Sequence, residues 1–299
     1  MITGNIRCID STANEIMYVT VDLTTACNKN CNFCVYRSEP GEGRYMNELT
    51  FDHLEAYLKD VIEHYDRTEI LLFGGEPTLH PKLFEMCDRL RALNPTVLRL
   101  QSNLSQDVDF YLELSKHIDQ LVLTLHVDDQ DKPEVLNKLF SLEPIAASIE
   151  IFFMFCNDTI FDKMPLYDSV KARFYTELHH LKRNELDNIL PQWKAYWQAE
   201  AKHYTLDHTI IQEDDDGFRH DPVYEELFFD VRPEVSKNKC YAGKQSMYID
   251  VDGIVYPCDI YKLEDRKPIH SVLCKYRPRQ PFMCEGVTCS RDWCVRRES

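Results

Sequence analysis

Short apolar segments alternate with longer amphipathic segments along residues 17–210, and this alternation constrains the fold more than any other feature of the sequence. The short segments have the length and the β-branched content of buried strands, and the longer ones have helical periodicity. Strands are predicted at 17–23, 69–73, 96–102, 120–126, 148–155 and 173–178, and helices at 50–66, 81–94, 107–117 and 132–142. Thr50 is the predicted N-cap of the first helix.

Repeated strand–helix units predict a parallel sheet whose strands are joined by right-handed crossovers. At ~30 residues per unit, the alternating region has room for about six units rather than the eight of a closed barrel. We therefore predict an α/β fold, with a partial (β/α)6 barrel of the TIM type.

The acidic run QEDDDGFRHDP, residues 212–222, interrupts the alternation. Charge runs are usually solvated loops, and this one also separates the alternating region from a cysteine-rich segment. Six of the twelve cysteines lie between Cys240 and Cys294. We therefore predict a core domain over residues 1–212 and a small domain, built around a cysteine-rich hairpin, over residues 213–299.

The composition limits the partners and the compartment. A formal net charge of −16 predicts that the chain binds neither nucleic acid nor an anionic membrane, because phosphate groups require a basic surface. The first residues lack the apolar run of a signal peptide, and no stretch approaches the ~18 apolar residues of a membrane span. A cytoplasmic location is expected, where thiols stay reduced, so the cysteines indicate metal or redox chemistry rather than disulfides.

Cys27, Cys31 and Cys34 lie within eight residues, in the stretch TTACNKNCNFCVYR. A disulfide is disfavoured in a reduced compartment, and structural zinc requires a fourth ligand, which no nearby Cys or His supplies. Coincidental buried cysteines are unexpected in so polar a loop. An iron–sulfur cluster is favoured because its thiolate ligands come in short cysteine runs. With three thiolates, a [4Fe–4S] cluster would keep one iron open for a ligand.

This cysteine spacing, directly after a first strand, resembles that of the radical S-adenosylmethionine (radical SAM) superfamily. The stretch LLFGGEPTLHP at 71–81 supports the resemblance, because Gly74, Gly75 and Glu76 are similar to that family's Gly-Gly-Glu motif. Glycine lets backbone carbonyls approach a bound amino group closely, and a glutamate can pair with its charge. The resemblance implies that the chain binds S-adenosylmethionine (SAM) and a [4Fe–4S] cluster held by the three cysteines.

The same resemblance implies a reaction and further site residues. SAM would be cleaved to methionine and a 5′-deoxyadenosyl radical that abstracts a substrate hydrogen, with a flavodoxin- or ferredoxin-type electron donor. Phe33 resembles the residue that lies against the adenine, and Ser102 with Asn103 resembles a polar pair near the ribose or the carboxylate, although both types also cap helices. His126 and Cys156, at the ends of the fourth and fifth strands, are candidate catalytic residues. A structural histidine and a small buried thiol are the alternatives.

The cysteine-rich segment contains a predicted hairpin, because two apolar runs meet at Asp252-Gly253. Its closure would bring Cys240 and Cys258 within reach of one metal site, whereas Cys274 lies apart. The candidate ligands are Cys240, Cys258, Cys284, Cys289 and Cys294. The pattern Cys-x12-Gly-x4-Cys resembles the SPASM/twitch extensions, but the longer cysteine series of a full SPASM domain is absent. That resemblance implies one auxiliary [4Fe–4S] cluster, held by Cys240, Cys258 and two of the last three cysteines; structural zinc is the alternative.

The motifs indicate a radical generator but leave the substrate open. In related families an auxiliary cluster accepts an electron from a substrate radical or binds the substrate. Only sixteen residues precede the first predicted strand, where many peptide-modifying relatives carry a leader-binding domain. We therefore expect oxidation or rearrangement of a small-molecule biosynthetic substrate, with a maturase that crosslinks, epimerises or oxidises a ribosomal peptide as the alternative. A ferredoxin-like electron carrier, which needs neither an open iron nor the glycine turn, and a zinc-stabilised binding module are disfavoured.

Overall fold

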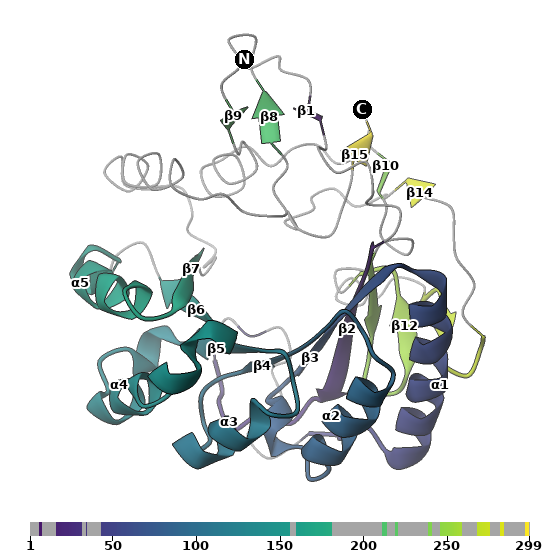
Figure 1. Ribbon diagram of the computed structural model, residues 1–299, viewed down its shortest axis with the longest axis horizontal. Coiled ribbons are helices and arrows are strands. Elements are labelled where there is room, and N and C mark those ends of the chain that lie inside the picture. Colours follow the sequence, from purple (N-terminus) through teal and green to yellow (C-terminus); the bar gives the residue numbers. More distant parts are fainter. Residues whose placement is uncertain are drawn as a thin grey trace. The chain divides into compact units, whose positions relative to one another are not determined.

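The structure is a computed structural model that divides into two compact units (Figure 1). The core unit comprises Ile16–Arg183 and Met247–Arg277, and the small unit comprises Met1–Glu15, Asn184–Ser246 and Pro278–Ser299. The residues that the structure describes are 6–7, 16–31, 34, 43–155, 160–180, 211–213, 219–220, 239–240, 246–258, 268–275, 282–283 and 297–298.

Six strands of the core unit form a parallel sheet in chain order. They are β2 (Ile16–Thr24), β3 (Arg67–Gly74), β4 (Val97–Ser102), β5 (Gln120–Leu125), β6 (Ile149–Phe155) and β7 (Tyr175–His180). Each strand pairs in parallel with the next one along the chain. The predicted α/β fold with a parallel sheet is therefore confirmed, and the arrangement is consistent with a partial TIM-type core. The carboxyl ends of all six strands meet at one edge of the sheet, where sites collect in such folds.

Helices connect these strands and lie on one side of the sheet (Figure 1). They are α1 (Glu48–His64), α2 (Leu83–Ala92), α3 (Val108–Leu114), α4 (Pro133–Phe140) and α5 (Ile160–Lys171), with the 3-10 turns η1 (Pro77–Leu79), η2 (Val127–Asp129) and η3 (Glu143–Ser148). Asn47 caps α1, because its Oδ1 accepts a hydrogen bond of 2.9 Å from the backbone N–H of Thr50. The predicted cap at Thr50 is wrong by one turn.

The two faces of β4 differ in polarity. In β4, Leu98 and Leu100 are fully buried, whereas the alternating Arg99 and Gln101 are partly exposed. Burial of each leucine contributes about 1.5–3 kcal/mol, and the layer of helices provides it. On β4, the opposite face therefore carries polar side chains.

The predicted hairpin is present, and it extends the parallel sheet. Strands β11 (Ser246–Ile249) and β12 (Ile254–Tyr256) are antiparallel, β13 (His270–Ser271) follows, and β11 lies beside β2. Gly253 has a φ of +77°, and Asp250 Oδ1 accepts hydrogen bonds from two N–H groups of the turn. Tyr248 donates to the buried Asp22 of β2, and Tyr57 of α1 bonds His270 at 2.7 Å. The hairpin is thus part of the core sheet.

The small unit has two three-stranded sheets among its described residues. One has the order β1 (Ile6–Arg7), β8 (Ile211–Glu213), β9 (Arg219–His220), and the other has the order β14 (Phe282–Met283), β10 (Lys239–Cys240), β15 (Arg297–Glu298). The twitch-like cluster domain and the boundary between residues 212 and 213 stay predictions. Within the described part of the chain, no helix combines the length and the apolar character that crossing a bilayer requires.

Candidate active site

The cysteine loop follows β2 directly, at the edge where the parallel strands end. Cys27, Cys31 and Cys34 are all partly exposed. The backbone N–H of Cys34 donates to the carbonyl of Cys31 at 3.0 Å, and that of Lys29 donates to Cys27 Sγ at 3.4 Å. Phe33, the residue expected against the adenine, lies outside the described residues.

The thiols of Cys27 and Cys31 both have raised pKa values. Burial, with smaller contributions from Glu76 and Cys34, raises the pKa of Cys27. Burial also raises the pKa of Cys31 to about 11, aided by the other two thiols and opposed by Lys29. A cysteine binds metal as the thiolate, so binding of a metal cluster by this loop would release protons.

The turn at Gly74-Gly75-Glu76 ends β3 and contacts the start of the cysteine loop. The N–H groups of Gly75 and Glu76 donate to the carbonyls of Thr24 and Ala26, both at 2.7 Å. Gly74 has a φ of +127°, and a Cβ on it would lie 2.1 Å from the Thr24 carbonyl oxygen. Glycine is therefore required here for the close approach of two backbone segments, besides the predicted approach to a ligand.

Glu76 is fully buried, and its carboxylate accepts four hydrogen bonds. Thr78 donates its hydroxyl at 2.6 Å and its N–H at 3.1 Å, Ser102 Oγ donates at 2.9 Å, and the N–H of Asn103 donates at 2.7 Å. Burial raises the pKa of Glu76, and these hydrogen bonds oppose the rise. Sequence reasoning missed Thr78. Pro77 could have revealed it, because proline at the first position of a helical turn marks the preceding residue, here Glu76, as the cap. The side chain of a cap accepts a hydrogen bond from the N–H of a residue in the first turn, here Thr78.

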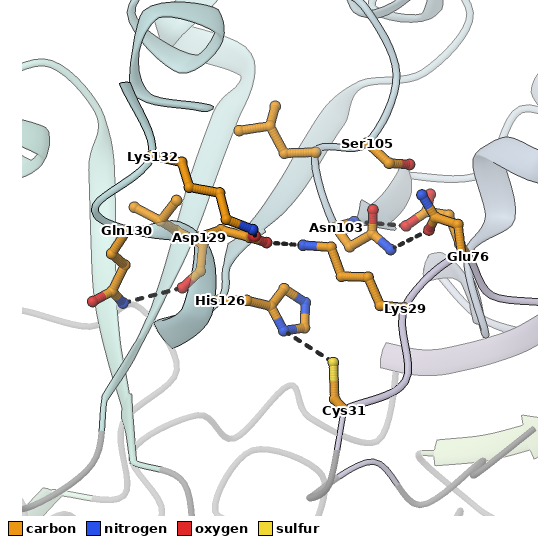
Figure 2. Close-up of polar contacts among 12 residues, drawn as sticks. Lys29, Cys31, Glu76, Asn103, Ser105, His126, Asp129, Gln130 and Lys132 are labelled. Carbon is orange, nitrogen blue, oxygen red and sulfur yellow. Dashed lines mark hydrogen bonds and ion pairs between the residues drawn. The ribbon is translucent and has the colours of Figure 1, made fainter. Parts of the chain in front are cut away.

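Ser102 and Asn103 lie at the end of β4, beside the cysteine loop. Ser102 Oγ also bonds Tyr111 Oη at 2.8 Å, so this hydroxyl is held inside the fold. Asn103 Nδ2 donates to Asn28 Oδ1 at 2.9 Å and lies 3.7 Å from Cys27 Sγ. Its Oδ1 is buried and has no hydrogen-bond partner among the described residues. Figure 2 shows Asn103 beside Glu76, near Lys29 of the cysteine loop.

His126 follows β5 and faces the cysteine loop, with Nδ1 at 3.6 Å from Cys31 Sγ (Figure 2). Burial, and then the charge of Lys29, lowers the pKa of His126 to about 4. The imidazole is therefore neutral at physiological pH. Its catalytic role stays a prediction, and Cys156, the other candidate, lies outside the described residues.

The sequence model of the radical SAM superfamily matches residues 21–160, the segment that contains both motifs. This chain carries a radical SAM domain. The match extends from β2 to the start of α5 and so includes the cysteine loop, the glycine turn and the ends of β4 and β5.

Curated relatives match part of the same domain. A probable GTP 3′,8-cyclase of Thermoplasma volcanium is 24% identical over 142 residues, 47% of this chain and 42% of that protein. A GTP 3′,8-cyclase of Cyanothece sp. is 30% identical over 100 residues, 33% and 29% of the two chains. An S-adenosylmethionine-dependent nucleotide dehydratase of Flammeovirga pacifica is 25% identical over 118 residues, 38% and 39% of the two chains. The chain spans less than half the length of each of these proteins.

Solved structures share the fold over more of the chain. The structure of anSMEcpe with bound AdoMet has a TM-score of 0.57 at 16% identity and covers 86% of this chain and 78% of that one. Streptococcus suis SuiB bound to S-adenosylmethionine has a TM-score of 0.55 at 11% identity, covering 86% and 63%. At these identities the likeness establishes the fold alone.

The residues of the radical SAM domain fit the cofactors that the family implies, SAM and a [4Fe–4S] cluster. Among the described residues, no three Cys, His, Asp or Glu side chains form a group that could hold a metal ion. A [4Fe–4S] cluster does not require three side chains to surround one ion, because each thiolate binds a separate iron. The unsatisfied Asn103 Oδ1 is an acceptor suited to a hydroxyl or ammonium donor of SAM.

The remaining cysteines are divided between the two units. Cys87 is buried in α2 as a core residue, and Cys274 is exposed. Cys258 is partly exposed just after β12, while the backbone of Cys240 lies in β10. Cys284, Cys289 and Cys294 lie outside the described residues. The ligand set of the auxiliary cluster therefore stays a prediction.

Proposed function

We propose that this chain is a radical SAM enzyme that reductively cleaves SAM at a [4Fe–4S] cluster and uses the 5′-deoxyadenosyl radical to abstract a substrate hydrogen. The observation that carries the proposal is the joining of the two motifs. Hydrogen bonds of Gly75 and Glu76 to Thr24 and Ala26 fix the glycine turn to the first residues of the cysteine loop. Residues of both motifs thus share one edge of the sheet, as a common ligand requires.

The chain's own residues would hold the two groups. The three cysteines would ligate three irons, and Asn103 Oδ1 would accept a hydrogen bond from SAM. Within the described residues, Oε2 of Glu76 accepts one hydrogen bond, from Asn103 N–H, and so keeps a lone pair for the SAM ammonium. When bound, the cluster supplies the electron that breaks a carbon–sulfur bond of SAM. A flavodoxin- or ferredoxin-type protein would deliver that electron in a cytoplasmic setting.

A small molecule is the proposed substrate, which the enzyme would oxidise or rearrange in a biosynthetic pathway. The curated relatives named above are two GTP 3′,8-cyclases, one of them probable, and a nucleotide dehydratase, and their names point to nucleotides. The open face of the sheet also carries polar groups: Gln101 bonds Thr124 at 3.1 Å, and Arg99 is partly exposed. Such groups suit a polar substrate better than an apolar one.

A peptide maturase is the second candidate. Two structures with this fold contain peptides in their complexes, anSMEcpe with a Cp18Cys peptide and SuiB with the precursor peptide SuiA. A ribosomal peptide that is crosslinked, epimerised or oxidised would enter along the same open face. Product analysis with small-molecule and peptide libraries would separate the two candidates.

One auxiliary [4Fe–4S] cluster is proposed for the cysteine-rich segment. In the small unit, Cys240 of β10 pairs with Phe282 of β14 on one side and with Arg297 of β15 on the other. Cys284 directly follows β14 in sequence, and Cys294 precedes β15 by three residues. The pairing supports Cys240 and two of the last three cysteines as ligands, with Cys258 as the proposed fourth.

Iron content tests both clusters. Fully reconstituted protein should contain about eight irons, as two four-iron clusters. Replacing Cys27, Cys31 and Cys34 with Ala should leave about four, and replacing Cys240 and Cys258 as well should leave none. Cys274→Ala is the matched control, because this exposed thiol is not a proposed ligand. Unchanged iron after the first set of substitutions would contradict the SAM cluster, and unchanged iron after the second would contradict the auxiliary one.

A further inference from the structure

An ion pair connects the cysteine loop to a strand end 100 residues away. Lys29 lies between two of the proposed ligands, and its Nζ contacts Asp129 Oδ2 (Figure 2). Asp129 Oδ1 accepts a second bond, of 2.7 Å, from Lys132 Nζ. The side chains of Lys29 and Asp129 are 21% and 13% exposed, so solvent screens this pair less than an ordinary surface pair. The proposed function assigns neither residue a role.

Asp129 lies in a hydrogen-bonded turn. Its N–H donates to the His126 carbonyl at 2.9 Å, and its own carbonyl accepts from the Lys132 N–H at 3.1 Å. The neighbouring Gln130 is almost fully buried, and its amide donates to the Leu125 carbonyl at 3.3 Å. Asp129 is therefore placed by η2 and β5, independently of the cysteine loop.

The described part of the loop, by contrast, depends on side chains for its position. Its last backbone bond to the sheet is the one from Glu76 N–H to the Ala26 carbonyl. Beyond it, side chains of the loop reach two other strand ends: Cys27 and Asn28 contact Asn103 after β4. After β5, Cys31 contacts His126, and Lys29 contacts Asp129. Of these contacts, the one between Lys29 and Asp129 joins opposite charges.

We propose that Asp129 is a positioning residue: through Lys29 it holds the cysteine loop against the end of β5 and offsets the lysine charge beside the cluster. The inference rests on the proposed function, because it assumes that these cysteines ligate a cluster. It assigns Asp129 no contact with SAM or substrate. An ordinary solvated ion pair, the alternative, would affect neither the loop nor the cluster.

The first measurement uses the iron-free protein. Hydrogen–deuterium exchange of residues 25–31 should be about fivefold faster in Asp129→Asn and in Lys29→Met than in wild type. The double variant should exchange no faster than either single variant, because both remove the same contact. Asp129→Glu should restore most of the protection. Lys132→Met is the matched control, because it removes the other partner of Asp129 and leaves the loop contact in place.

The second measurement is the midpoint potential of the SAM-binding cluster in the reconstituted protein. This cluster is identified as the one whose electron paramagnetic resonance signal changes when SAM is added. Reduction adds a negative charge to the cluster. Asp129→Asn should therefore raise the potential, because it removes a nearby negative charge, whereas Lys29→Met should lower it. Substitutions that merely loosened the loop would shift both potentials in the same direction.

The outcomes separate the inference from the proposed function. Wild-type exchange rates in Asp129→Asn would overturn the inference even if the cluster assembles normally. Equal loss of protection in Lys132→Met would also overturn it, because Asp129 would then act only within its own turn. Potential shifts of the same sign in Asp129→Asn and Lys29→Met would overturn the charge role. Absence of any SAM-responsive cluster in wild-type protein would instead overturn the proposed function and, with it, the cluster half of the inference.

Discussion

Glu150 on β6 gives a quantitative prediction about stability. The residue is 7% exposed, and burial raises its pKa from the ordinary 4.5 to about 7, with Glu177 adding to the rise and Arg99 opposing it. The group is an acid whose pKa is higher in the folded chain than in the unfolded chain. Between pH 4.5 and 7 the unfolded chain therefore binds fewer protons than the folded one, and stability falls as the pH rises.

The magnitude follows from the two pKa values. Each tenfold change in the dissociation constant is worth about 1.4 kcal/mol, so the ionised form costs the folded state about 3 kcal/mol once the pH exceeds about 8. At pH 5 most of this penalty is absent. Glu150→Gln removes the ionisation, so relative to wild type its free energy of unfolding should become more favourable by about 2–3 kcal/mol between pH 5 and pH 8.

Urea unfolding of the iron-free wild type and of Glu150→Gln at the two pH values measures this difference. Contributions of the substitution that do not depend on pH, such as changes in packing, cancel in the comparison. A difference between the two proteins that is the same at pH 5 and pH 8 would refute the reasoning. So would a change of the opposite sign.

Two further predictions concern the glycine turn. Gly74→Ala should destabilise the core unit by more than about 2 kcal/mol, measured by urea unfolding, because the methyl group would meet the Thr24 carbonyl at a φ of +127°. A loss below about 0.5 kcal/mol would contradict the close approach. Thr78→Ala should cost about 1.5–3 kcal/mol by the same assay, because it removes the hydroxyl that bonds the buried Glu76. Thr78→Ser keeps a hydroxyl and should recover most of the lost stability. Equal losses of stability in Thr78→Ala and Thr78→Ser would show that the hydrogen bond contributes little.

Much of the core fold could be predicted because its signals are local. Buried parallel strands are short and apolar, so the segments 17–23 and 69–73 were recognisable, and they form the inner parts of β2 and β3. Helix ends are less well specified, because a cap depends on one side chain. Asn47 and Thr50 are both capping types, and only the structure shows that Asn47 accepts the Thr50 N–H.

The site was predictable only where chemistry is encoded in a short motif. The glycine turn and the three cysteines have characteristic spacings, whereas the partners of those residues come from distant segments. No local pattern indicates that Lys29 contacts Asp129 or that the hairpin at Tyr248 lies beside β2. Such contacts depend on the order of strands in the sheet, which sequence periodicity does not specify.

The measurement that tests the central claim most directly is formation of 5′-deoxyadenosine. Anaerobically reconstituted wild-type protein, given SAM and a strong reductant, should produce it, and so should the Cys274→Ala control. The variant with Ala at Cys27, Cys31 and Cys34 should fold, as judged by an unchanged circular dichroism spectrum, and produce none above background. Formation of 5′-deoxyadenosine by that variant at the wild-type rate would contradict the account, as would its absence from iron-replete wild-type protein.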